Sequence, residues 1–131
     1  NILRDVGEDR GRGRIYLPLE DLKKFNYSEE DLFKGTINEN WKALMAFQLA
    51  RARDWFQKSE EGIKWLSIDA RWPIWTSLRL YSGILNSIEK LDYDVFNNRA
   101  YVKGWVKAVN LPISYLITIN DEKYKLKTLI N

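Results

Sequence analysis

Apolar side chains recur every three or four positions along two long runs, and this spacing limits the fold more than any other feature of the sequence. In the first run, residues 39–65, the helical spacing is kept by Trp41, Leu44, Gln48, Ala52, Trp55 and Phe56. In the second run, residues 70–91, one face is formed by Ile74, Leu78, Tyr81, Leu85 and Ile88. No stretch alternates as a strand would. The sequence therefore predicts an all-α fold built on two long helices.

Shorter helical segments precede the first long run. Residues 1–9 have the pattern of a helix end, which Gly11 and Gly13 break. A short helix is expected over residues 20–25. Ser28 suits the N-cap of another, because three acidic residues occupy the turn that follows it.

The long helices carry signals at their ends. Thr36 and Glu39 fit a capping box ahead of the first. Pro73 lies near the start of the second, where a proline is tolerated. A last helix is expected over residues 99–119, with a kink at Pro112.

Histidine and cysteine are both absent, and this limits the chemistry of the chain. A Ser-His-Asp triad and a thiolate metal site are excluded, so any metal must be held by oxygen ligands, which favours Mg²⁺, Mn²⁺ or Ca²⁺. The net charge of +3 with no long basic run does not indicate a nucleic-acid partner. The longest uncharged stretch near the C-terminus, residues 108–120, is shorter than the ~20 residues that span a bilayer.

The N-terminal segment holds the residues most suited to chemistry. Asn1, Asp5 and Asp9 are four residues apart, so on a helix they form one ladder of oxygen ligands with Cβ atoms ~6 Å apart. Mg²⁺ prefers such ligands and also binds substrate phosphate oxygens. Arg4 projects beside the ladder and can hold a phosphate at the same time. An isolated pair of aspartates at this spacing is, however, most often only a solvated helix face.

The whole string NILRDVGEDRGRGRIYLP, residues 1–18, closely resembles the second aspartate-rich motif of the squalene and phytoene synthase family. The resemblance continues through RAR at 51–53, DARWPIW at 69–75, DYDVF at 92–96 and RAYV at 99–102. The later segments are similar to the phytoene-forming branch. The match weakens only after about Leu116. Arg79 departs from it, because the family usually has an aliphatic side chain there.

The resemblance implies a fold and an extent. Residues 1–131 are expected to form the C-terminal part of an isoprenoid-synthase helical bundle, within a single trans-isoprenyl diphosphate synthase domain. The family's first aspartate-rich motif does not occur in this sequence. The chain is therefore expected to be a fragment that lacks the upstream part and is inactive alone.

The resemblance also implies roles for single residues. Asn1, Asp5 and Asp9 match magnesium ligands, and Asp5 and Asp9 are the expected catalytic residues. The expected substrate contacts are Arg4, Arg14, Tyr16, Tyr81 and Arg99. The plainer interpretation is an ordinary core aromatic for Tyr81 and a surface arginine for Arg99.

The implied reaction is the head-to-head condensation of two geranylgeranyl diphosphates through prephytoene diphosphate to 15-cis-phytoene, the first committed step of carotenoid biosynthesis. Mg²⁺ is the expected cofactor, with Mn²⁺ as a substitute, and no NADPH is required. Other carotenoid-pathway enzymes and a membrane surface are further expected partners. The expected location is a bacterial cytoplasm or a plastid, peripheral to a membrane.

Three other interpretations remain open at this point. A squalene or dehydrosqualene synthase would share the same motif. A non-catalytic member of the family, acting as an assembly factor, would have lost the aspartates, whereas Asp5 and Asp9 are both present. A helical binding module without enzyme activity would show no effect of magnesium on ligand binding.

Overall fold

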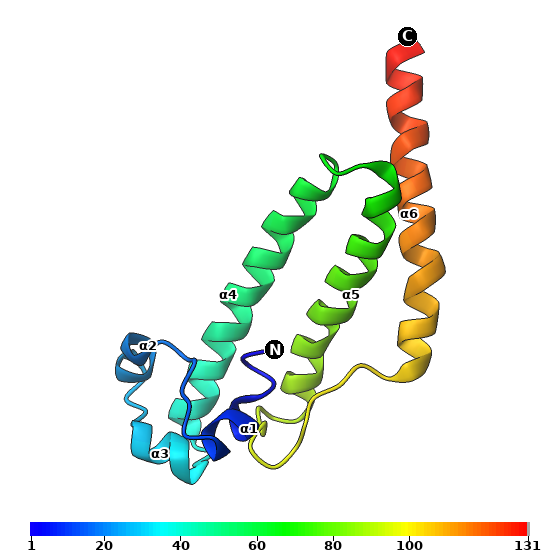
Figure 1. The fold of residues 1–131 in the computed structure, drawn as a ribbon. Helices are drawn as coiled ribbons and strands as arrows, with labels where there is room; N and C mark the ends of the chain where they lie inside the picture. Colours follow the sequence, from blue (N-terminus) through cyan, green and yellow to red (C-terminus); the bar gives the residue numbers. More distant parts are fainter. Residues whose placement is uncertain (131) are drawn as a thin grey trace.

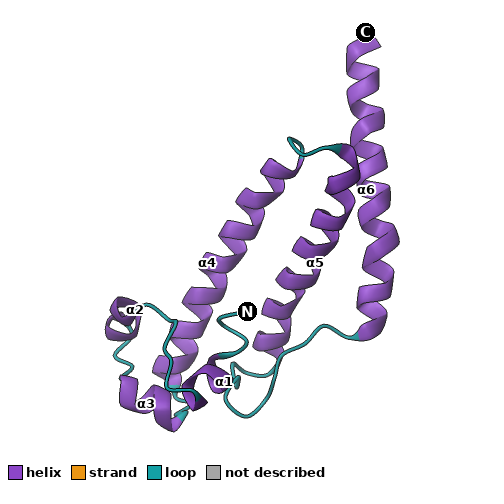
Figure 2. Cartoon of the chain, viewed as in Figure 1, coloured by secondary structure: helices purple, strands orange, loops and turns teal. Residues whose placement is uncertain are grey.

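The computed structural model describes residues 1–130, with side chains for residues 1–120, and within that part every regular element is a helix. The predicted all-α class is therefore confirmed (Figure 2). Three short helices gather at one end of the molecule beside three long ones (Figure 1). Their bounds are Val6–Gly11 (α1), Leu19–Lys24 (α2), Glu29–Lys34 (α3), Glu39–Ile63 (α4), Ile68–Lys90 (α5) and Gly104–Ile130 (α6). None of the helices over the described residues has the length and apolarity needed to cross a bilayer.

The cap predicted at Ser28 is confirmed, and the one predicted at Thr36 is wrong. The backbone N–H of Asp31 donates to Ser28 Oγ at 3.0 Å. Helix α4 is instead capped by Asn38, whose Oδ1 accepts the N–H of Trp41 at 2.9 Å. Thr36 belongs to the end of α3, because its own N–H donates to the carbonyl of Asp31. Sequence spacing alone did not separate the stop of α3 from the start of α4.

The two long runs fold as predicted, within a few residues at each end. α4 starts at Glu39 as expected and stops two residues early, at Ile63. α5 passes through Pro73 without a break. Between them, Arg71 donates to the carbonyls of Leu66 and Lys64, both at 2.9 Å, which closes the turn that reverses the chain.

The last helix starts later and ends later than predicted. Residues 91–103, here called the strap, connect α5 to α6 without helical structure. Ala100 is buried there, and Ser87 Oγ donates to the carbonyl of Tyr101 at 2.9 Å, so this end of the strap runs along α5. These contacts use backbone that a helix would have satisfied internally. The kink at Pro112, which lies inside α6, stays a prediction.

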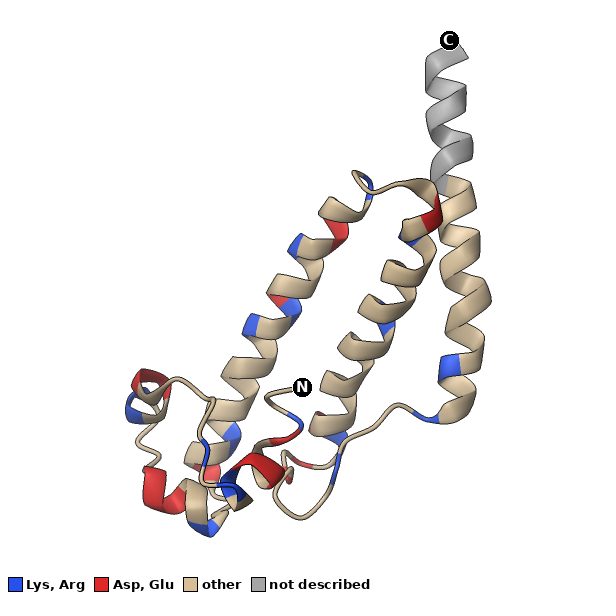
Figure 3. Cartoon of the chain, viewed as in Figure 1, with Lys and Arg blue, Asp and Glu red and all other residues tan. Residues whose placement is uncertain are grey.

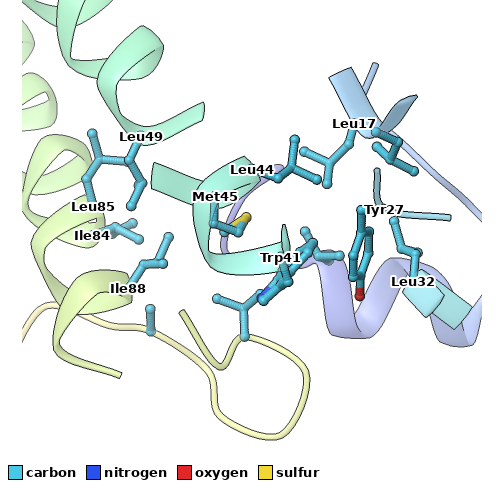
Figure 4. Close-up of a cluster of buried hydrophobic side chains, with 14 residues drawn as sticks. Leu17, Tyr27, Leu32, Trp41, Leu44, Met45, Leu49, Ile84, Leu85 and Ile88 are labelled. Atoms are coloured by element: carbon cyan, nitrogen blue, oxygen red, sulfur yellow. The ribbon is translucent and has the colours of Figure 1, made fainter. Parts of the chain in front are cut away.

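The hydrophobic core fills the end of the molecule where the short helices meet α4 and α5 (Figure 4). Trp41 is fully buried at its centre, with ring centroids 5.1 Å from Tyr27 and 4.6 Å from Phe96. Burying an aromatic side chain of this size contributes about 1.5–3 kcal/mol. α4 therefore anchors the short helices and the strap through a single aromatic cluster.

Arg79 joins α5 to α6. Its Nε donates to Oδ1 of Asn110 at 2.6 Å, and Asn110 is buried. The other buried polar residues of α6, Ser114 and Thr118, follow at helical spacing and donate to carbonyls one turn earlier. This hydrogen bond accounts for an arginine where the family usually has an aliphatic side chain.

A buried carboxylate joins α2 to α4. Asp21 is only 4% exposed and accepts hydrogen bonds from Gln48 at 2.7 Å and from two nitrogens of Arg51 at 2.7 and 3.2 Å. The hydrogen bonds from Arg51 hold the pKa of Asp21 below its ordinary value, against the opposing effect of burial. Asp21 thus stays ionised at neutral pH.

Replacing Asp21 by Asn in the full-length protein should lower the free energy of unfolding at pH 7 by about 1–3 kcal/mol. Because the folded pKa lies below the unfolded value of about 3.9, the stabilisation is present above that pH and is lost as the pH falls through the folded pKa. Urea unfolding at pH 7, 5 and 3 should therefore show the two proteins converging in acid. Parallel curves, or an equal effect of the exposed control Asp54→Asn, would contradict this.

Candidate active site

The N-terminal segment keeps a helical register ahead of α1. The N–H of Asp5 donates to the carbonyl of Asn1 at 2.9 Å, and that of Asp9 donates to the carbonyl of Asp5 at 2.8 Å. Asn1, Asp5 and Asp9 consequently line one open cavity of about 310 Å³, together with Tyr16 and Arg99. This cavity is here called the charged cavity. Figure 3 shows acidic and basic segments gathered at this end of the molecule.

Asp5 forms a bidentate ion pair with Arg4. Arg4 donates from Nε to Oδ1 at 2.8 Å and from Nη2 to Oδ2 at 2.7 Å. These bonds hold the pKa of Asp5 below its ordinary value, so the carboxylate is charged at neutral pH. Arg99 adds a second guanidinium, with Nη2 at 3.4 Å from Oδ1.

The oxygen donors around this cavity do not form a closed metal site by themselves. Among the described residues, no three carboxylates lie close enough to hold a metal ion by themselves. The amide of Asn1 and the carboxylates of Asp5 and Asp9 are nevertheless hard donors around one cavity, which suits Mg²⁺. Mg²⁺ usually keeps several waters and takes further ligands from substrate phosphates.

Two charged residues of this cavity were not predicted from the sequence. Glu8 accepts from Nη2 of Arg12 at 2.7 Å, and its other oxygen lies 3.8 Å from Nη1 of Arg99. Glu8 and Arg12 stand four residues apart, which is the spacing of a helical ion pair. This spacing was the signal that could have found them.

Tyr16 borders this cavity, whereas Arg14 borders a neighbouring crevice. Tyr16 is 51% exposed and lines it directly. Arg14 is exposed and borders only a small crevice that it shares with Asp9 and Tyr16. The substrate contacts predicted for both stay predictions.

An apolar groove of about 710 Å³ runs between α4 and α5 and ends at the charged cavity. Arg4 and Tyr81 line its charged end, and Leu78 lies along its wall, whereas Trp72 and Trp75 do not line it. Its apolar walls are formed mainly by Ile2, Leu3, Ala52, Trp55, Phe56, Ile74, Leu78, Ile84, Leu85 and Ile88. Such a groove suits a long hydrocarbon chain with an anionic head.

Tyr81 is not an ordinary core aromatic. It is 46% exposed and, with Arg4, also borders a second cavity of about 250 Å³ between α5 and the start of α6. Tyr81 therefore borders two cavities that it shares with Arg4, whose guanidinium group holds Asp5. Arg99 is likewise exposed, although it faces the α1 carboxylates rather than bulk solvent alone.

Comparison with known proteins shows which family this chain belongs to. The sequence profile described as squalene/phytoene synthase matches residues 1–106. The chain belongs to the squalene/phytoene synthase family. The "15-cis-phytoene synthase" of Synechococcus elongatus is 61% identical over 116 residues, covering 88% of this chain and 38% of that protein. The chloroplastic phytoene synthase of Daucus carota is 51% identical over 115 residues, covering 88% of this chain and 29% of that protein.

The fold of this squalene/phytoene synthase chain is also seen in a solved structure. A crystal structure of a dehydrosqualene synthase in complex with ligand matches 98% of this chain and 42% of that one, with a TM-score of 0.78 and 30% identity. The predicted isoprenoid-synthase helical fold is confirmed. The chain spans less than half the length of each of these relatives.

Proposed function

We propose that the full-length protein is a 15-cis-phytoene synthase, a prenyltransferase that joins two geranylgeranyl diphosphates head to head. The observation that supports this most is the junction of an arginine- and aspartate-lined cavity with an apolar groove of about 710 Å³. The identity of 61% to a cyanobacterial protein of that name favours this substrate over shorter ones.

The proposal assigns roles to eight residues in and around the charged cavity. Arg4, Tyr81 and Arg99 contact the diphosphate, with Arg14 and Tyr16 at the edge. Asn1, Asp5 and Asp9 hold Mg²⁺, which Mn²⁺ can replace. The bound ion supplies the positive charge that neutralises a leaving diphosphate.

The groove contributes by excluding water. Loss of diphosphate leaves an allylic cation, which water would trap as an alcohol, and apolar walls keep it from doing so. The cation attacks the double bond of the second molecule, and loss of a proton from the resulting cation closes the cyclopropane ring of prephytoene diphosphate. A second ionisation, rearrangement and loss of one proton complete phytoene. Two diphosphates and two protons leave and no electrons are exchanged, so no NADPH is required.

Residues 1–131 are, in this proposal, the C-terminal part of one trans-isoprenyl diphosphate synthase domain. The limited share of each relative that the chain covers supports this. The cyanobacterial and chloroplastic relatives favour a bacterial cytoplasm or a plastid. Exposed tryptophans such as Trp65, 83% exposed, favour peripheral contact with a membrane, where other carotenoid-pathway enzymes would also work.

A dehydrosqualene or squalene synthase is the second candidate, because the solved dehydrosqualene synthase shares the fold at a TM-score of 0.78. Its identity of 30% is about half of that to the phytoene synthase of Synechococcus elongatus. The two candidates differ in the prenyl chain they accept and in their product.

The decisive experiment supplies geranylgeranyl diphosphate to the full-length protein with Mg²⁺ or with EDTA. We expect phytoene with Mg²⁺ and none with EDTA. Residues 1–131 alone should form no phytoene under either condition, because they carry only one of the family's two aspartate-rich motifs. Conversion of farnesyl diphosphate instead would favour the second candidate, and phytoene formation by residues 1–131 alone would contradict the expected inactivity.

A further inference from the structure

The strap, residues 91–103, carries Arg99 to the charged cavity from outside any helix. Its path is set early, at Asp92 and Tyr93, whose φ angles are +51° and +63°. Residues with side chains rarely adopt this left-handed conformation, and two in succession are rarer still. The surrounding contacts must therefore hold the strap in this shape.

Helix α4 makes those contacts at the same two residues. The indole N–H of Trp41 donates to the carbonyl of Tyr93 at 3.0 Å. The ammonium group of Lys42 lies 2.6 Å from Oδ2 of Asp92. Trp41 and Lys42, neighbours in the first turn of α4, thus hold the two left-handed residues in place. Trp41 does so by a hydrogen bond to the backbone of Tyr93, and Lys42 by an ion pair with Asp92.

The strap is then pressed against α1. Val95 is buried and the ring of Phe96 packs on Trp41 with centroids 4.6 Å apart. The backbone of Val95 and Phe96 approaches Gly7 so closely that a Cβ atom there would lie 2.6 Å from the Val95 carbonyl oxygen. A shift of the strap at its α4 anchor would therefore be passed on to the segment that faces Asp5 and Glu8.

Beyond Phe96, the strap turns back on itself before it reaches Arg99. Asp94 accepts from the N–H of Asn97 at 3.0 Å and from the amide group of Asn98 at 2.8 Å. Arg99 follows directly, with its guanidinium within 3.4 Å of Asp5 and 3.8 Å of Glu8. The ion-pair partners of Arg99, Asp5 and Glu8, both lie outside α4. An effect of α4 on Arg99 is therefore expected to pass through the strap.

We infer that Trp41 and Lys42 are positioning residues that fix Arg99 over the charged cavity by holding the strap at Asp92 and Tyr93. The inference rests on the proposed function, in which Arg99 contacts the substrate diphosphate. Neither residue touches the cavity itself. Removing either side chain should weaken diphosphate binding in a protein that carries Arg99. It should have little further effect in a protein in which Arg99 has been replaced.

The test uses the full-length protein with Lys42→Met, Trp41→Phe, Arg99→Gln and the two double variants with Arg99→Gln. Lys34→Met is the matched control, because Lys34 also makes a 2.6 Å ion pair, with Glu30, away from the strap. Two quantities are measured: the affinity for inorganic pyrophosphate with Mg²⁺ by calorimetry, and the hydrogen exchange of a peptide spanning the strap. Lys42 is at the surface, so its variant should fold even if that of Trp41 does not.

We expect Lys42→Met to weaken pyrophosphate binding about fivefold and to change it less than about twofold in the Arg99→Gln background. Strap exchange should become faster in Lys42→Met and Trp41→Phe, and stay unchanged in Lys34→Met. An equal loss of affinity with and without Arg99, or unchanged strap exchange, overturns the inference. Failure of the unsubstituted protein to bind pyrophosphate would count against the proposed function, while strap exchange would still decide the anchoring.

Discussion

Replacing Asp5 by Asn in the full-length enzyme is expected to lower phytoene formation by about 100- to 1,000-fold. The substitution keeps the shape of the side chain and removes its charge. Asp5 is the most constrained of the proposed metal ligands, because Arg4 binds both of its oxygens and Arg99 approaches one of them. Loss of the carboxylate charge would weaken both the binding of the metal ion and the ion pairs with Arg4 and Arg99. Product formed from geranylgeranyl diphosphate at saturating Mg²⁺ is the measurement.

Two controls separate chemistry from folding in this experiment. Asp54→Asn removes an exposed carboxylate of α4 that pairs with Lys58, and should leave turnover unchanged. The melting temperature of Asp5→Asn is measured alongside, because the side chains of the Arg4–Asp5 pair are only 20% and 21% exposed and their bonds also stabilise the fold. Turnover near the original level in a well-folded Asp5→Asn enzyme would remove Asp5 from the catalytic site.

Replacing Gly7 by Ala should lower the free energy of unfolding by about 1–3 kcal/mol and should also weaken pyrophosphate binding. A Cβ atom at this position would meet the Val95 carbonyl oxygen at 2.6 Å and the Phe96 Cα and carbonyl oxygen at 2.9 Å. These are backbone atoms, which cannot rotate away as a side chain would. The strap must therefore lift from α1 and take Arg99 with it.

Gly11→Ala is the matched control for this variant. Gly11 lies in the same helix, and a Cβ atom there would have no neighbour within 4 Å. Because alanine favours a helix more than glycine does, Gly11→Ala should be neutral or slightly stabilising. Urea unfolding of the two variants side by side measures the difference. Equal stabilities would mean that α1 and the strap do not pack as closely as described.

Local signals predicted most of the fold. The long apolar runs gave α4 and α5 within a few residues, because helical periodicity repeats many times over such lengths. Ser28 was predicted correctly as a cap, since its partner Asp31 is only three residues away. The start of α6 was wrong because residues 99–103 are held by contacts with α1 and α5. A pattern within the segment does not reveal contacts made with distant helices.

The candidate site, like the fold, was predicted from the sequence only where the signal is local. Asn1, Asp5 and Asp9 could be placed together from their spacing, since four residues make about one helical turn. Glu8 and Arg12 have that spacing too, yet only the folded chain shows that Arg99 reaches Glu8. The left-handed turn at Asp92 and Tyr93 has only a weak sequence signal, because aspartate tolerates this conformation better than most residues but neither position is glycine. The roles of all these residues stay predictions.

The charged cavity is electrically balanced before any ligand arrives. Counted together with Arg4, which lines the adjoining cavity, the carboxylates of Asp5, Glu8 and Asp9 are matched by the guanidinium groups of Arg4, Arg12 and Arg99, three charges of each sign. A balanced site exerts little long-range pull on an anion, so encounter with a diphosphate would gain little speed from electrostatic steering and would vary only weakly with ionic strength. Capture of the substrate would then depend on its hydrocarbon tail entering the groove, with the arginines exchanging partners at short range.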